Sequence, residues 1–271
     1  MSGFHKLLQH AAGQVNTALD TLLAVPDGHE GRLYEAMRYT VLADGKGFRP
    51  FLCLATAKIF DAPEPAAIRV ASAIECIHCY SLIHDDLPCM DDDDVRRGKP
   101  ALHKAFDEAT AILAGDALIS LAFEILTDEA THDTVSTRLD LVAGLARASG
   151  MQGMVGGQMI DMMAARDRLD AGGLTRLQKM KTGALISFAV DAGAVLGDAV
   201  GVDADHWRAI ARRRRRPRYG ELAVVQVPGT GGGVVEMHLH RAELGGRGLR
   251  NEQPAVARPQ RQPGAGCALA R

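Results

Sequence analysis

The sequence predicts an all-α protein, and three observations lead to that fold class. Apolar residues recur every three to four positions through most of the first 211 residues, which is the period of a helix with one buried face. Alternation of apolar and polar residues, the period of a strand, is not sustained there. Aromatic residues make up only 4% of the 271 residues, whereas alanine, leucine and methionine are plentiful, and this bias favours helices over strands.

The helical period predicts a series of helices in chain order. We expect one helix in each of the segments 5–24, 31–43, 50–60, 65–88, 108–127, 134–150, 151–164, 173–197 and 203–211. Glycine, proline and aspartate mark several of the turns between them, at Pro26-Asp27-Gly28, Asp44-Gly45, Asp61-Ala62-Pro63 and Ala171-Gly172-Gly173. An apolar content of 47% is ample for these helices to enclose a core.

The composition changes abruptly near Ala211. Residues 212–271 contain 12 arginines, no lysine, four acidic residues, ten glycines and five prolines. This part shows neither a helical nor a strand period, and its many helix breakers predict an irregular, poorly structured tail. We therefore expect a helical domain over 1–211 and an arginine-, glycine- and proline-rich tail over 212–271.

Several kinds of protein are disfavoured by the composition. The net charge of −2 gives no general attraction for nucleic acid, and the arginine run 212–216 has no aromatic stacking platform beside it. The first ten residues lack the apolar region of a secretory signal, and the chain has an odd number of cysteines, five. We see no run of about 18 uncharged apolar residues that would span a membrane. A reducing cytoplasm, no membrane span and no nucleic-acid partner are the resulting expectations.

An acidic stretch follows the helix predicted over 65–88. Pro88 is expected to end or kink this helix and to let Asp91 turn back towards Asp85. Carboxylate oxygens are the ligands that magnesium prefers, and Arg96 and Arg97 offer guanidinium groups suited to phosphate oxygens. A solvated acidic loop is the plain alternative, but the apolar helix before the run and the arginines after it favour a magnesium–diphosphate site.

Residues 81–100 (SLIHDDLPCMDDDDVRRGKP) resemble the first aspartate-rich motif of the trans-isoprenyl diphosphate synthases, most closely those of the bacterial farnesyl diphosphate synthase type. Other signatures of that family occur in the expected order, at Gly45–Pro50, Glu75–His78, Leu113–Leu118, Gly156–Asp161 and Lys181–Leu185. The resemblance implies an antiparallel helix bundle around a central cavity, a homodimer, and Mg²⁺ as cofactor.

The resemblance also implies roles for individual residues. Metal ligands would be Asp85, Asp86, Asp91 and Asp161. The allylic diphosphate would be held by Arg96, Gln158 and Lys181, and the diphosphate of isopentenyl diphosphate by Lys46, Arg49, His78 and Arg97. Lys181 and Thr182 would lie next to the reacting groups. Taken singly, each has a plain alternative: a lysine or arginine in a turn is usually solvated, and a histidine in an apolar helix is often a core residue.

The activity implied is a prenyl transfer. Isopentenyl diphosphate would condense with dimethylallyl or geranyl diphosphate to give farnesyl diphosphate. Tyr80 precedes Asp85 by five residues, about 7.5 Å along a helix, where its ring would close the pocket that receives the growing chain. We therefore expect a fifteen-carbon product, with geranylgeranyl diphosphate as the alternative.

The resemblance ends in the last part of the chain. After Lys181-Thr182-Gly183 the family continues with a Phe-Gln pair and a second aspartate-rich motif, whereas this sequence has no aspartate after Asp205. The change in composition coincides with that loss, so we hypothesise a frameshift near codons 211–221. If the chain is made as written, we expect greatly reduced activity, and an inactive or regulatory subunit of an intact synthase becomes the alternative function.

Overall fold

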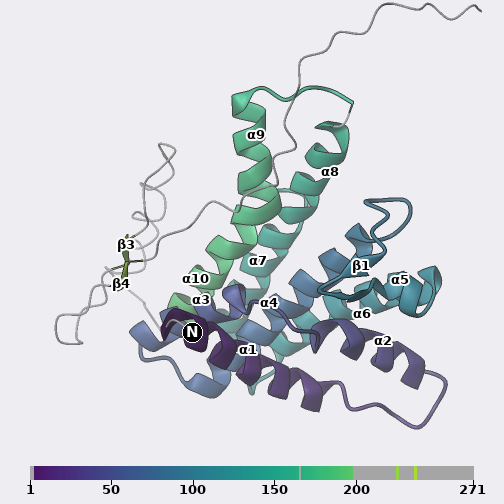
Figure 1. Cartoon of the computed structure of the whole chain (residues 1–271). Coiled ribbons are helices and arrows are strands. Elements are labelled where there is room, and N and C mark those ends of the chain that lie inside the picture. The colour runs from purple at the N-terminus through teal and green to yellow at the C-terminus, as the bar shows by residue number, and fades with distance from the viewer. Residues whose placement is uncertain (1–2, 165, 198–223, 226–234, 237–271) are drawn as a thin grey trace, which may run out of the picture. The chain divides into compact units, whose positions relative to one another are not determined.

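The computed structural model describes residues 3–164 and 166–197, together with two short strands at 224–225 and 235–236. Figure 1 shows a helical protein, so the predicted fold class is confirmed. The elements in order are α1 (Gly3–Leu22), α2 (Gly31–Val41), α3 (Phe48–Ile59), α4 (Glu64–Asp85), β1 (Val95–Arg96), β2 (Lys99–Pro100), α5 (Leu102–Ala105), α6 (Glu108–Thr127), α7 (Val135–Ser149), α8 (Met154–Ala164), α9 (Ala171–Gln178), η1 (Lys179–Gly183) and α10 (Ala184–Leu196).

The chain divides into two units, Met1–Arg218 and Tyr219–Arg271. In the second unit the structure describes one antiparallel pair, β3 (Val224–Val225) with β4 (Val235–Glu236). The helix predicted at 203–211 and the remainder of the predicted irregular tail lie outside the described residues. The irregular character of the tail and its boundary at 211 therefore stay predictions.

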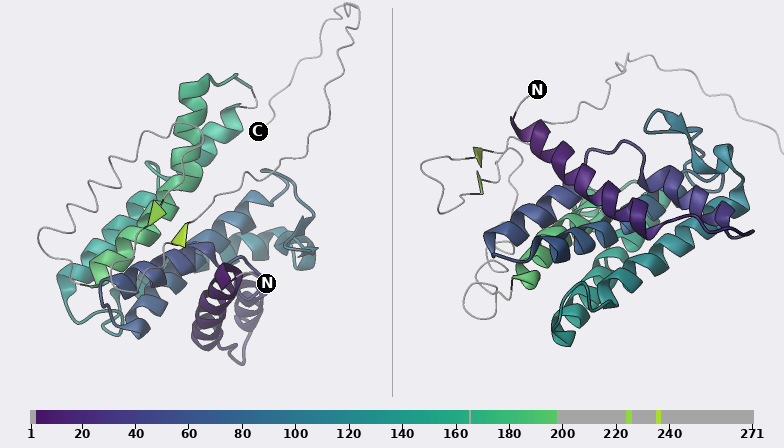
Figure 2. Two further views of the ribbon diagram at one scale, coloured as in Figure 1. Left: turned by 60° about the vertical axis from the view of Figure 1, so that its left-hand side comes forward. Right: turned by 90° about the horizontal axis from the view of Figure 1, so that it is seen from below.

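Helix α4 forms the core of the first unit. It contains neither glycine nor proline after Pro65, and residues all around its circumference are buried, as expected for a helix that is apolar on every side. It packs against α1, α2, α3, α6 and α10. Figure 2 shows the other helices arranged around it, with α8 and α9 side by side and extending away from α1 and α2. A helix enclosed in this way holds its side chains at fixed positions.

The end of α4 agrees with the predicted effect of Pro88. The helix stops at Asp85, and the backbone N–H of Asp91 then donates to the carbonyl oxygen of Asp85 at 2.8 Å. A second turn bond runs from the N–H of Met90 to the carbonyl of Leu87 at 2.9 Å. The chain therefore turns back on itself, and the backbone of Asp91 lies beside that of Asp85, as expected.

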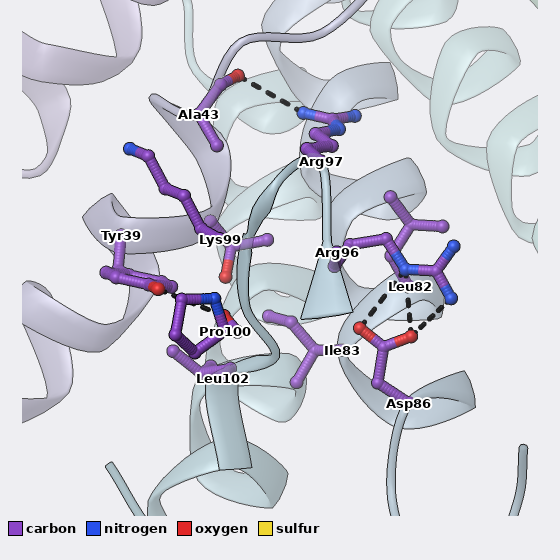
Figure 3. A pocket seen from close by; sticks show the side chains of 11 residues that line it. Tyr39, Ala43, Leu82, Ile83, Asp86, Arg96, Arg97, Lys99, Pro100 and Leu102 are labelled. Carbon is purple, nitrogen blue, oxygen red and sulfur yellow. Dashed lines mark hydrogen bonds and ion pairs between the residues drawn. The ribbon is translucent and has the colours of Figure 1, made fainter. Parts of the chain in front are cut away.

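The loop after the acidic stretch contains a small hairpin that the sequence did not predict. Strands β1 and β2 pair through only two residues each, which is too short for a detectable alternation. Arg97 and Gly98 connect them with φ of 53° and 77°, the left-handed conformation that two-residue hairpin turns favour. The Tyr39 hydroxyl donates to the carbonyl of Pro100 at 2.9 Å and ties the hairpin to α2 (Figure 3).

The predicted turn at Ala171-Gly172-Gly173 is wrong. These residues form the first turn of α9, because the Asp170 carboxylate accepts a hydrogen bond from the Gly173 N–H at 2.6 Å and caps the helix. The single helix predicted at 173–197 is also divided, since a π-helical turn, η1, separates α9 from α10. Such turns insert one extra residue and often accompany functional sites.

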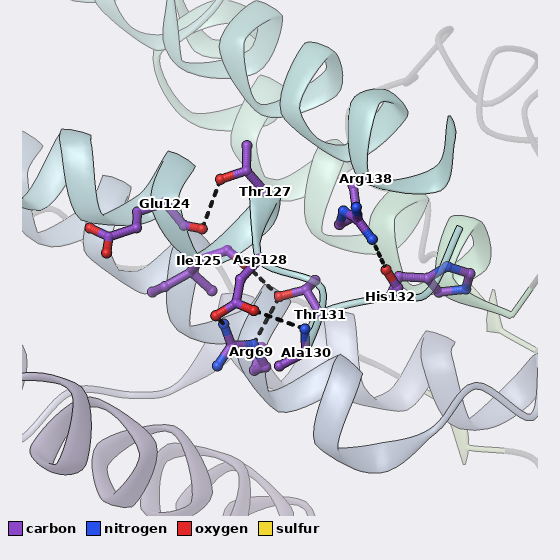
Figure 4. Close-up of polar contacts among 9 residues, drawn as sticks. All are labelled: Arg69, Glu124, Ile125, Thr127, Asp128, Ala130, Thr131, His132 and Arg138. Atoms are coloured by element: carbon purple, nitrogen blue, oxygen red, sulfur yellow. Dashed lines mark hydrogen bonds and ion pairs between the residues drawn. The ribbon is translucent and has the colours of Figure 1, made fainter. Parts of the chain in front are cut away.

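The loop between α6 and α7 is attached to α4 by hydrogen bonds (Figure 4). Arg69 on α4 donates from Nε to the Thr131 hydroxyl at 2.9 Å and from a terminal nitrogen to the Asp128 carboxylate at 2.6 Å. Thr131 is fully buried and donates to the carbonyl of Ile125. These bonds fix the start of α7 relative to the central helix.

Two helices are long and apolar enough to cross a membrane by length and composition alone. They are α4, 72% of whose apolar window is buried within the protein, and α6, for which the figure is 39%. A core helix of a soluble protein passes the same test, so this is weak evidence, and the absence of a membrane span stays a prediction.

Candidate functional site

Two of the acidic residues that follow α4, Asp86 and Asp93, form ion pairs with Arg96 of the hairpin. Asp86 is almost completely buried, and Arg96 binds its carboxylate through Nε at 2.9 Å and through a terminal nitrogen (Figure 3). The same guanidinium reaches Asp93 at 2.8 Å. Two residues predicted to bind metal and diphosphate, Asp86 and Arg96, are therefore paired with each other. For Arg96 to contact a phosphate, it must share or exchange these carboxylate partners.

Asp85 is half-buried at the C-terminal end of α4. Burial raises the pKa of its carboxyl to about 6, the positive charge of Lys181 opposes this rise, and the neighbouring carboxylates of Asp91 and Asp86 add to it. A carboxylate whose negative charge is disfavoured by other carboxylates is a place where a cation is stabilised. Asp85 and Asp91 are thus suited to a shared cation.

Lys181 extends towards this acidic region from the π turn η1. Its ammonium binds the Asp161 carboxylate of α8 at 2.6 Å, and its charge also acts on Asp85 of α4. One turn before Asp161, the side-chain oxygen of Gln158 is buried without a hydrogen-bond partner among the described residues. Thr182 is exposed. The structure therefore pairs Lys181 with Asp161 and places its charge within reach of Asp85, while the roles predicted for these residues stay predictions.

Helix α8 approaches η1 so closely because Gly157 has no side chain. A Cβ atom on Gly157 would lie 2.6 Å from the Cα of Lys181. Backbone atoms cannot move aside as a flexible side chain can, so glycine is required for this packing. The position of Lys181 consequently depends on a residue in a different helix.

A second cluster of charged groups forms around His78, about two turns before Asp85 on α4. Arg49 at the start of α3 is half-buried, and its Nε has no partner among the described residues. Burial, together with the positive charges of Arg49, Arg97 and Arg96, lowers the pKa of His78 to about 3. His78 is therefore neutral near pH 7. Lys46, in the loop between α2 and α3, is exposed.

Glu75 belongs to this second cluster and has no role predicted from the sequence. The residue is buried, and its carboxylate lies 3.3 Å from a terminal nitrogen of Arg97. The signal was present in the sequence, because a glutamate in the middle of an apolar helix is buried and needs a partner.

Tyr80 is buried at 7% exposure, as its predicted place below the acidic residues requires. Its ring meets the ring of His84 edge to face, with 5.8 Å between centroids, and His84 in turn packs over Gly115 of α6. Burial, together with the nearby charge of Asp85, raises the pKa of the Tyr80 hydroxyl to about 12. The phenol is thus neutral, and its ring is held in one orientation.

A pocket with about 350 Å³ of empty space, part of it open to solvent, lies between α2, α4 and the hairpin (Figure 3). Arg96, Arg97, Lys99 and Asp86 line it over an apolar floor that includes Leu82 and Leu102. It does not extend to Asp85 or Lys181. Arg97 therefore lines this pocket and also acts on His78 in the second cluster.

The predicted magnesium ligands do not form a compact cage. Within residues 3–164 and 166–197, no group of three or more histidine, cysteine, aspartate or glutamate side chains is placed to hold a metal ion. Magnesium needs fewer protein ligands than that, because it commonly binds through one or two carboxylates and completes its shell with water and substrate phosphates. Asp85 and Asp91 fit this requirement. The assignments of Asp85, Asp86, Asp91 and Asp161 as metal ligands all stay predictions.

The raised pKa of Asp85 leads to a prediction about stability without metal. A carboxyl whose folded pKa is about 6 and whose ordinary value is 3.8 favours folding below the lower value, and this contribution is lost as pH rises through 6. The Asp85→Asn variant should therefore melt at a higher temperature than the original chain at pH 8 in the presence of EDTA. The two melting temperatures should converge near pH 4. Equal melting temperatures at both values of pH would mean that Asp85 is not destabilised by its surroundings.

Comparisons with known proteins agree with this geometry. The sequence pattern of the polyprenyl synthetase family matches residues 30–213. Farnesyl diphosphate synthase of Haemophilus influenzae is 44% identical over 195 residues, which cover 72% of this chain and 66% of that protein. The chloroplastic heterodimeric geranylgeranyl pyrophosphate synthase large subunit 1 of Arabidopsis thaliana is 45% identical over 203 residues, covering 73% and 54%.

A solved structure is similar as well. The apo crystal structure of an FPP/GFPP synthase from Zymomonas mobilis superimposes with a TM-score of 0.73 at 50% identity, covering 76% of this chain and 75% of that one. The chain spans between about half and two thirds of the length of the two curated relatives. The family pattern and the identity to these relatives show that the chain belongs to the polyprenyl synthetase family.

Proposed function

We propose that the chain is a prenyltransferase that joins isopentenyl diphosphate to an allylic diphosphate. The observation that supports this most is the presence of two separate charged clusters, one around Asp85 and Lys181 and one around Arg49 and His78. His78 and Asp85 are seven positions apart on α4, about 10 Å along the axis. Two diphosphates can thus bind side by side, each with its own set of charged side chains.

The two clusters suit different diphosphates. The first contains carboxylates as well as Lys181, which fits an allylic diphosphate that binds together with Mg²⁺. When bound, magnesium supplies positive charge that weakens the bond between the allylic carbon and the diphosphate. The second has Arg49, Arg97 and the neutral His78, which can bind the diphosphate of isopentenyl diphosphate directly.

The chain's own residues would then stabilise the negative charge of the departing diphosphate and exclude water from the allylic cation. Lys181 offers an ammonium to the departing diphosphate, as Arg96 does once it exchanges a carboxylate partner. The double bond of isopentenyl diphosphate attacks the allylic cation, and a proton then leaves the new carbon skeleton to the released diphosphate. Because water would quench the cation, the apolar side chains around Tyr80 must exclude it. Thr182, next to Lys181, is proposed to lie near the reacting carbons.

We further propose farnesyl diphosphate as the product, with Tyr80 closing the end of the space that receives the growing chain; Tyr80 does not line the pocket beside the hairpin. The relatives are divided between farnesyl and geranylgeranyl synthases, so chain length rests on this residue. Tyr80→Ala should shift the product from fifteen to twenty carbons or more, as measured by chromatography of the dephosphorylated alcohols. Tyr80→Phe keeps the ring and should keep the length. An unchanged product from Tyr80→Ala would show that another residue closes the pocket.

The direct test is an assay with isopentenyl and dimethylallyl diphosphates in the presence of Mg²⁺. The proposal expects condensation products that disappear with EDTA and in Asp85→Ala. The second candidate, an inactive or regulatory subunit, is suggested by the lack of an aspartate after Asp205, where the family that the sequence resembles has a second aspartate-rich motif. It expects no product from this chain alone and a changed rate or product when an intact synthase is added. A homodimer and a cytoplasmic location, both expected from the sequence, are part of the proposal.

A further inference from the structure

Glu75 is a buried carboxylate within the otherwise cationic second cluster. It lies inside α4 one turn before His78, with 10% of its side chain exposed. Its Oε1 lies 3.3 Å from the Arg97 guanidinium and accepts from the Cys79 thiol at 3.7 Å. Arg97 also donates to the carbonyl of Ala43 at 3.3 Å, so it is held between α4 and the loop before α3.

The charge of Glu75 acts on a second guanidinium as well. Burial lowers the pKa of Arg49, the positive charge of Arg97 lowers it further, and the carboxylate of Glu75 opposes both effects. Two guanidinium groups are thus close enough to repel each other, with one carboxylate close to both. Buried like charges are stable only when such a partner compensates them.

We propose that Glu75 is a positioning residue that holds Arg97 and Arg49 together in the empty site and is displaced from Arg97 in part when a diphosphate binds. The inference rests on the proposed function, because it takes this cluster to be the site of isopentenyl diphosphate. Glu75 then has two effects of opposite sign. It stabilises the protein without ligand, and it lowers the affinity for the diphosphate, since both compete for the same guanidinium.

Moderate affinity has a use in this reaction. Each condensation consumes the bound isopentenyl diphosphate, and the site must then be emptied and refilled. A carboxylate that re-forms its pair with Arg97 as the diphosphate leaves makes departure easier without loosening the arginine. Glu75 therefore adjusts the exchange of ligand and touches no reacting atom.

The experiment is a calorimetric titration of the full chain with inorganic diphosphate in EDTA, together with melting temperatures. Glu75→Gln keeps the volume and an acceptor for Arg97 but removes the charge. It should melt at a lower temperature without ligand and bind diphosphate about tenfold more tightly, the order expected of one unit charge at a distance of a few ångström. Glu75→Asp keeps the charge and should stay within about threefold of the original affinity. Glu35→Gln, an exposed loss of one charge on α2, is the control and should change neither quantity.

Two outcomes of the titration would overturn the inference alone, and one would overturn the proposed site together with it. If the original chain binds diphosphate and Glu75→Gln binds it with the same or lower affinity, the inference is overturned while the function stands. If the affinity of Glu75→Asp for diphosphate differs from that of the original chain as much as the affinity of Glu75→Gln does, packing rather than charge is responsible. The inference is then overturned as well. If the original chain binds no diphosphate, the proposed site fails and the inference fails with it. Should Glu75→Gln unfold, recovery of the fold on adding diphosphate supports the inference, and no recovery contradicts it.

Discussion

Joining residues 1–197 to the C-terminal part of an intact relative, such as the Zymomonas mobilis enzyme, should raise the rate of prenyl transfer a hundred- to a thousandfold or more. In the family that this sequence resembles, a second aspartate-rich motif follows the Lys181 segment, and this chain has no aspartate after Asp205. The proposed site therefore has one of two sets of charged groups for the allylic diphosphate. Loss of a single charge-stabilising group typically costs about 10²–10³ in rate, so restoring a whole set should have at least that effect.

The measurement is initial velocity with isopentenyl and dimethylallyl diphosphates, for the original chain and the chimera at equal concentration. A chimera that also carries Asp85→Ala is the matched control, and it should lose the gain. A folded chimera without added activity would contradict the proposed role of the first 197 residues. Resequencing the gene across codons 211–221 tests the frameshift hypothesis independently, because an intact reading frame there would exclude it.

Gly157→Ala should destabilise the protein by about 1–3 kcal/mol and reduce activity of the chimera about a hundredfold. The added Cβ would lie 2.6 Å from the Cα of Lys181, so either α8 or η1 must move. Either movement carries the Lys181 ammonium away from Asp161 and Asp85. Displacements of about 1 Å in groups that position a substrate are enough for losses of this size.

The control for Gly157→Ala is Gly13→Ala in α1. A Cβ on Gly13 has nothing within 4 Å, and alanine is the better helix former by about 0.5–1 kcal/mol, so this variant should be neutral or more stable. Urea denaturation measures the stability of both variants, and steady-state kinetics measures activity. If Gly157→Ala retains both, the close approach of α8 to η1 does not position Lys181.

The elements that the sequence predicted well are those whose signal is local. The spacing of apolar residues located the long helices, and Pro88 located the end of α4 and the return of Asp91. The hairpin was missed because its strands are two residues long, and its turn is shown only by the φ of Arg97 and Gly98. The π turn at Lys179–Gly183 has no periodic signal, since it inserts one residue into a pattern that is otherwise helical.

Prediction of the site from the sequence was limited in a different way from prediction of the fold. Residues that are proposed to act on the substrate, such as Lys181 and Asp161, came from the resemblance, and the structure joins these two in an ion pair at 2.6 Å. The ion pairs between side chains of the protein itself could not be predicted from the resemblance. The pairing of Asp86 with Arg96 and of Glu75 with Arg97 depends on how the hairpin folds back on α4, and sequence spacing does not reveal such a contact.

The burial of α4 on all sides has a consequence for how this site could evolve. Glu75, His78, Tyr80 and Asp85 occupy one uninterrupted helix, so their separations are multiples of a fixed rise of about 1.5 Å. An inserted or deleted residue between them would rotate the helix by about 100° and disturb every packed face at once. Sequence variation in this segment is thus confined to substitutions, without insertions or deletions. Under the proposed function, a change of product size can arise by single substitutions, while the spacing between the two proposed diphosphate sites is inherited unchanged.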